Sequence, residues 1–223
     1  QGKILVPFSF ESPLSGVGKN IDPEDKMWYR KNFELPKNWS EKDVVIHFEA
    51  VDYKSDVWVN DILVGSHKGG FDRFSFNITP YLKPNGLQKI VLAVEDATNF
   101  SSQPRGKQQI NASGIYYTPV SGVWQTVWLE AVSSEAYIKQ VKTTTNIDEN
   151  TVTLIPLSNQ SLVSGYMVRT TVFFNGEKVT SAEIKPNVPL TLRIDTPKLW
   201  SPDHPHLYDV SMSLMNPSGT EID

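Results

Sequence analysis

The stretch SGVWQTVWLE, residues 121–130, alternates apolar and polar side chains like a β-strand and carries two tryptophans four positions apart. Side chains at even spacing along a strand lie on the same face. Trp124 and Trp128 are therefore predicted on one face, with valine and leucine side chains on the other. Apolar residues on both faces are typical of a strand buried between two layers. We expect core packing for Trp128, while for Trp124 core packing and a ligand-facing role both stay open.

Runs of the same kind make up most of the chain, and helical periodicity is scarce. Each run is short, rich in Val, Ile, Thr and aromatic residues, and bounded by Gly, Pro, Asn or Asp. Many such strands without intervening helices predict an all-β chain of β-sandwiches. Within VWVNDILVG a tight hairpin is predicted to turn at Asn60 and Asp61, since both residue types tolerate positive φ. The other runs are DVVIHFEAV, FSFNIT, KIVLAVED, TVTLIPL, YMVRTTVFF, LTLRID and LYDVSMSLM.

Two domains are predicted, at residues 1–133 and 134–223, because the small polar residues of VSSEAY follow the strand that ends at Glu130. The strand spacing of the second block suits an immunoglobulin-like sandwich, which has roughly 100 residues when complete. The last residues, NPSGTEID, are typical of a turn that leads into another strand. We therefore expect the second domain to be incomplete at its C-terminus.

Composition and charge exclude several classes of protein. The net charge is −4 and the basic residues are scattered, unlike the basic patch of a nucleic-acid-binding surface. No apolar run approaches the ~18 residues of a membrane span. Cysteine is absent, which excludes disulfides, structural thiolate zinc and a thiol nucleophile. The compartment stays open, with a secreted or periplasmic location favoured over a cytoplasmic one.

The sequence contains no complete motif for phosphate binding, metal binding or hydrolysis by a serine nucleophile. SGVGKN, at residues 15–20, has a Gly-Lys pair but no first glycine of a phosphate loop, and Asn20 stands where that loop has Ser or Thr. His204 and His206 flank Pro205, and no other histidine or acidic pair lies near them in sequence. No Gly-x-Ser-x-Gly elbow occurs, and no carboxylate pair stands out for glycosidic cleavage. We therefore expect no catalytic residue, no metal and no cofactor in this chain.

Four segments in order resemble the N-terminal half of glycoside hydrolase family 2, which includes β-galactosidases, β-glucuronidases and β-mannosidases. They are WYRKNFELP, HFEAVDYKSDVWVNDILVGSHKGGFDRFSFNITPYL, RGKQ and GIYYTPVSGVWQTVWLEAV; the later PKLWSPDHPHLYDVSMSL resembles the family's next domain. The resemblance implies a jelly-roll (galactose-binding-like) sugar-binding sandwich followed by an immunoglobulin-like one. It also implies that SGVWQTVWLE closes the first sandwich, with Trp128 and Leu129 structural.

Family members cleave β-glycosides in a third domain, a (β/α)8 barrel that carries two glutamates and works with retention. The family's barrel signatures and its usual opening strand are absent from this sequence. The resemblance therefore implies the inactive N-terminal portion of a longer, β-galactosidase-like hydrolase, trimmed at both ends. Its expected partners are a carbohydrate, the missing barrel and, in a homo-oligomer, further copies. The alternative is a free-standing carbohydrate-binding or adhesin-type protein.

The stretch NFSSQPRGKQQINASG, residues 99–114, is a long polar segment between two strand runs, and such loops are often functional. The resemblance places it at the mouth of the barrel. Its cationic and amide side chains can bond sugar hydroxyls. The alternative is a mobile loop that contacts only water. In some family members an aspartate binds sugar and sodium, but Gly69 stands closest to that position here, so no metal ligand is expected. The residues expected to complete the pocket are Arg105, Lys107, Gln108, Tyr117 and Trp124.

Overall fold

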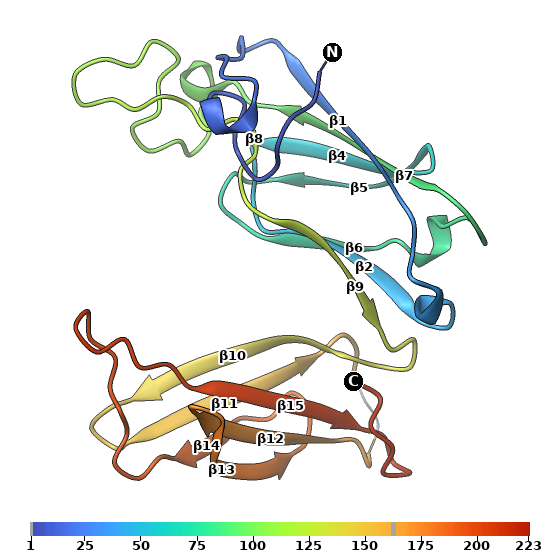
Figure 1. Ribbon diagram of the computed structural model, residues 1–223, viewed down its shortest axis with the longest axis vertical. Coiled ribbons are helices and arrows are strands. Elements are labelled where there is room, and N and C mark those ends of the chain that lie inside the picture. Colours follow the sequence, from blue (N-terminus) through green and yellow to red (C-terminus); the bar gives the residue numbers. More distant parts are fainter. Residues whose placement is uncertain (1, 162–163) are drawn as a thin grey trace. The chain divides into compact units, whose positions relative to one another are not determined.

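The computed structural model describes residues 2–161 and 164–223 and is all-β, as the strand runs predict (Figure 1). The chain divides into two compact units, Gln1–Ala131 and Val132–Asp223. Each unit contains two sheets of three or four strands, so the prediction of two β-sandwiches is confirmed.

In the N-terminal unit a four-stranded sheet has the order β1-β7-β4-β5 and a three-stranded sheet has the order β6-β2-β9, while β3 pairs with β8. Neighbouring strands of the four-stranded sheet are antiparallel. The predicted hairpin is confirmed between β4 and β5, with Asn60 and Asp61 at φ 48° and 70°. The strands are β1 (Lys26–Phe33), β2 (Asp43–Phe48), β3 (Val51–Asp52), β4 (Lys54–Val59), β5 (Ile62–Lys68), β6 (Phe74–Asn77), β7 (Gln88–Glu95), β8 (Gly122–Val123) and β9 (Val127–Val132).

The core of this unit follows from strand alternation, which β4 shows most clearly. Ser55, Val57 and Val59 are buried, whereas the side chains between them point to the outer face of the sheet. Burying a valine side chain stabilises the fold by roughly 1.5–3 kcal/mol. The inward side chains of both sheets pack together in one cluster, which includes Val44, Ile46, Phe48, Val57, Val59, Leu92, Val94 and Val123.

The C-terminal unit has two three-stranded sheets, of order β10-β11-β14 and β13-β12-β15. Val152, Leu154 and Val172 are buried between them. The predicted turn after the last strand is present, since Ile222 N donates to Leu214 O at 2.9 Å. The strands are β10 (Ile138–Asn146), β11 (Thr151–Ser158), β12 (Met167–Phe174), β13 (Glu177–Ile184), β14 (Leu190–Arg193) and β15 (Asp209–Met215).

The prediction that Trp128 belongs to the core is wrong. SGVWQTVWLE forms two strands rather than one, because β8 ends at Val123 and β9 begins at Val127. Trp128 is 40% exposed on β9, an edge strand, and stacks on the His47 ring at 4.0 Å. Val127 and Leu129 already supply the core-facing side of β9, so the indole lies outside. There its Nε1 donates to Glu49 at 3.1 Å.

Candidate functional site

The connection between β7 and β8, residues 96–121, is held in place by a buried carboxylate at its start. Asp96 accepts a hydrogen bond from Thr98 N at 2.7 Å and from Gln103 Nε2 at 2.7 Å. It also accepts one from the Ser121 hydroxyl at 2.6 Å. One side chain thus ties together the beginning, the middle and the end of the loop, which runs beyond the sheets in Figure 1.

Two further buried carboxyl groups lie beside Asp96. Glu11 accepts a hydrogen bond from Ser121 N at 3.0 Å, and Asp52 in β3 pairs with Gly122 in β8. One oxygen of Glu11 and one of Asp52 have no hydrogen-bond partner among the described residues. We call Glu11, Asp52 and Asp96 the carboxylate cluster.

The surroundings favour the protonated forms of Asp52 and Glu11. The pKa of Asp52 is raised to about 7, chiefly by burial and also by the charges of Asp96 and Glu11, while a hydrogen bond from Gln108 lowers it. Burial likewise raises the pKa of Glu11, and the hydrogen bonds from Ser121 lower it. At neutral pH this region therefore carries less negative charge than three acidic residues would otherwise give.

Two glycines allow the backbone to approach the cluster closely. A Cβ on Gly70 would lie 2.5 Å from Asp52 Oδ1, so only glycine fits there without a shift. Gly122 has φ 85°, and a Cβ on it would overlap the Tyr29 hydroxyl, which accepts a hydrogen bond from Val123 N at 3.1 Å. The strand pair β3–β8 can therefore lie tightly against its neighbours.

Three of the predicted site residues meet in the loop. Gln108 Oε1 accepts a hydrogen bond from Val120 N at 2.6 Å, and Arg105 Nη1 donates to Gln108 O at 3.0 Å. Gln108 also forms an isolated bridge with Tyr117, whose side chain is 67% exposed. Gln108 faces the carboxylate cluster, whereas the ring of Tyr117 faces solvent.

Of the other two predicted residues, Lys107 joins this group through its backbone and Trp124 lies outside the loop. Lys107 is exposed, and its carbonyl accepts a hydrogen bond from Tyr117 N at 2.9 Å. Trp124 is half-buried, donates from Nε1 to Gly70 O at 2.8 Å and packs edge-on against Phe71. Trp124 thus contacts Gly70, whose backbone approaches Asp52 closely.

Sequence reasoning missed the carboxylate cluster. The available signal was weak: Asp52 and Asp96 each follow an apolar strand run, in FEAVD and LAVED. Strand ends commonly carry acidic residues, and nothing in the sequence pairs these two with Glu11. The described residues contain no group of three or more His, Cys, Asp or Glu side chains that could hold a metal ion. In the same residues, no helix is long and apolar enough to cross a membrane.

Comparison with known proteins identifies both units. Residues 8–131 match the family model described as "Glycosyl hydrolases family 2, sugar binding domain", and residues 132–223 match "Glycosyl hydrolases family 2". A "Beta-galactosidase" of Thermoanaerobacter pseudethanolicus is 28% identical over 84% of this chain and 26% of its own length. A "Putative beta-glucuronidase" of Formosa agariphila is 28% identical over 88% of this chain and 24% of its own length.

A solved structure shows the same fold. The β-glucuronidase from Ruminococcus gnavus in complex with C6-substituted uronic isofagomine superimposes with a TM-score of 0.74, at 20% identity. That match covers 98% of this chain and 38% of the glucuronidase chain. The present chain thus spans about a quarter of the length of the curated relatives described above, and covers their N-terminal domains.

Proposed function

Because the chain belongs to glycosyl hydrolase family 2, we propose that it is the N-terminal, non-catalytic portion of a retaining β-glycosidase of β-galactosidase type. In this proposal a (β/α)8 barrel outside the present sequence supplies the two catalytic carboxyl groups. The alternative of a free-standing carbohydrate-binding or adhesin-type protein gains no support from the relatives, which are named as glycosidases.

We further propose that the loop between β7 and β8 completes the sugar pocket of the whole enzyme. The observation that carries this is the fixed shape of the loop: Asp96 binds three of its segments, and Gln108 holds Val120. A loop ordered in advance loses less conformational entropy when it binds a ligand than a mobile loop does. This geometry favours a binding role over the alternative of a mobile, solvated loop.

The side chains that the loop presents suit such a role. Arg105 and Lys107 are cationic donors and Tyr117 offers an exposed ring with a hydroxyl group. Ile115 and Tyr116, in the same loop, are also exposed. In the proposal these two apolar side chains contact the barrel and the polar ones contact sugar hydroxyls. A homo-oligomer of the whole enzyme stays a prediction.

The test is kinetic and uses the full-length enzyme. Arg105→Ala and Tyr117→Ala are expected to lower kcat/KM for aryl β-galactosides by about tenfold or more, which corresponds to about 1.4 kcal/mol of transition-state binding. Only a small change in melting temperature is expected, because neither side chain is buried and Arg105→Ala removes a single hydrogen bond, to Gln108 O. Gln108→Ala is less informative, since it also removes the hydrogen bond to Val120 N.

Lys89→Ala is the matched control. Lys89 is also a partly exposed cation, but it lies at the opposite end of β7 from Asp96 and pairs with Asp61. Seven strand positions correspond to roughly 23 Å. Wild-type kcat/KM in both Arg105→Ala and Tyr117→Ala would overturn the assignment of the loop to the pocket.

A further inference from the structure

On the outer face of the sheet β1-β7-β4-β5, aromatic and polar side chains form a surface that is separate from the loop between β7 and β8. Strand pairing places residues side by side on this face. Trp28 and Asp56 both pair with Ala93, and Asp56 pairs with Ser66. In the neighbouring row Lys26 and Lys54 both pair with Glu95. The two rows thus form one continuous surface across four strands.

Two tryptophans form the apolar part of this surface. The indoles of Trp28 and Trp58 lie 5.7 Å apart, centre to centre, and are inclined by 30°. Trp28 is 60% exposed. Ala93, on the same face, is only 1% exposed because the larger neighbouring side chains cover it. An aromatic ring that is largely open to solvent on a rigid sheet is a platform on which a flat apolar ligand face can stack.

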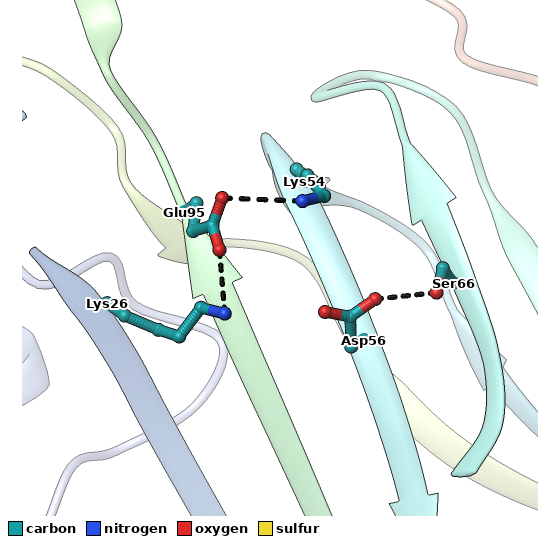
Figure 2. A network of polar contacts seen from close by, with 5 residues as sticks. All are labelled: Lys26, Lys54, Asp56, Ser66 and Glu95. Carbon is teal, nitrogen blue, oxygen red and sulfur yellow. Dashed lines mark hydrogen bonds and ion pairs between the residues drawn. The ribbon is translucent and has the colours of Figure 1, made fainter. Parts of the chain in front are cut away.

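The polar part is fixed in place beside the indoles. Glu95 binds Lys26 Nζ at 2.7 Å and Lys54 Nζ at 3.5 Å, so it lies between the two lysines (Figure 2). Asp56 accepts a hydrogen bond from the Ser66 hydroxyl at 2.5 Å. Each of these groups uses only part of its hydrogen-bonding capacity, because an ammonium has three donors and a carboxylate has several acceptor sites. Donors and acceptors therefore remain available at fixed positions.

Two clefts share lining residues with this surface. A cleft of about 570 Å³ is lined by Lys26 and Trp28, together with residues of the N-terminal segment. A second cleft, of about 380 Å³, is lined by Lys54 and Glu95. A chain-like ligand could therefore extend from the indoles along the row of charged residues.

The chemistry of the surface selects among ligand classes. Charged residues are depleted in the centre of protein–protein interfaces, whereas here they occupy the row next to the indoles. Asp56 and Glu95 would repel a phosphate backbone. The two positive charges of Lys26 and Lys54 are balanced by the negative charges of Glu95 and Asp56, so these four groups offer a uronic acid no net positive charge. Planar rings flanked by paired hydrogen-bonding groups match neutral pyranose rings, which have an apolar face and a rim of hydroxyl groups.

We propose that Trp28, Trp58, Asp56, Glu95 and the two lysines form a binding surface for a neutral β-linked oligosaccharide, separate from the pocket that the loop completes. The choice of β-linked sugars rests on the proposed function, while the surface itself does not. A second sugar site on the N-terminal unit would hold a polymeric substrate near the enzyme between cleavage events.

Binding of β-linked galacto- and gluco-oligosaccharides to the 223-residue chain, measured by calorimetry, tests the proposal. Saturable binding is expected for the unaltered chain, and Trp28→Ala is expected to weaken it by about tenfold or more. Trp200→Ala is the matched control, because Trp200 is 61% exposed and lies in the C-terminal unit. This variant should bind within about twofold of the unaltered chain.

Three results would overturn the proposal: no saturable binding of either sugar series, equal affinity in Trp28→Ala, or self-association that Trp28→Ala abolishes without any sugar binding. The last result would make the face a contact between copies of the chain. The kinetic test measures cleavage by the full-length enzyme, whereas this test measures binding by the 223-residue chain and varies Trp28. Failure of the loop assignment in the kinetic test is thus distinguishable from failure of the oligosaccharide surface in the binding test.

Discussion

Asp52→Asn should stabilise the N-terminal unit at neutral and alkaline pH. The carboxyl group of Asp52 is 2% exposed and lies beside Asp96 and Glu11, and Gly70 packs against it. Its pKa is raised from 3.8 to about 7, chiefly by burial. The folded state therefore keeps a proton that the unfolded chain releases. Asparagine has nearly the shape of the protonated carboxyl group and carries no charge to bury.

The sign and size follow from proton linkage. Between about pH 4 and about pH 7 the folded state binds more protons at this group than the unfolded state, so the free energy of unfolding falls as pH rises. Each unit of pKa difference corresponds to about 1.4 kcal/mol, which gives about 4 kcal/mol above pH 7 as an upper bound. From about pH 5 to about pH 8, Asp52 should cost the wild-type chain about 2.6 kcal/mol. The asparagine variant lacks this loss.

Denaturant unfolding followed by tryptophan fluorescence measures the effect, since five of the six tryptophans lie in the N-terminal unit. Asp22→Asn, at an exposed loop carboxylate, is the control and should keep the wild-type pH profile. Parallel profiles for wild type and Asp52→Asn would refute the assignment of the raised pKa to Asp52.

Two further predictions concern activity and backbone geometry. The 223-residue chain alone should leave aryl β-galactosides at the buffer rate of hydrolysis, because the catalytic carboxyl groups are proposed to lie in the barrel; turnover that survives repurification would contradict this. Gly122→Ala should lower the free energy of unfolding by at least about 1 kcal/mol more than Gly86→Ala. Both glycines have positive φ, but an added Cβ overlaps Tyr29 only at Gly122 and meets no described atom within 4 Å at Gly86. Equal losses in the two variants would show that the contact with Tyr29 is unimportant.

The period-two pattern and the turn residues were sufficient to predict the all-β architecture. Local alternation alone determines which side chains share one face of a strand. The Asn60-Asp61 pair forms the hairpin turn because both residue types tolerate positive φ. The motif set from Trp28 to Leu129 was sufficient to predict the family, which the family models over residues 8–131 and 132–223 confirm. The strand pattern, the turn and the family motifs each depend on short segments of the chain, so a single sequence is enough to predict them.

The direction of Trp128 and the assembly of the carboxylate cluster were decided only by the tertiary structure. Alternation in SGVWQTVWLE separates two faces but does not say which one meets the opposite sheet when both are apolar. Glu11 and Ser121 are 110 positions apart in the chain, yet Ser121 N donates to Glu11 and its hydroxyl donates to Asp96. A buried carboxyl group is stable only with partners that compensate its desolvation, and the partner of Glu11 is distant in the sequence. The fixed shape of the loop therefore depends on contacts that form only in the folded chain, both within residues 96–121 and between Ser121 and Glu11.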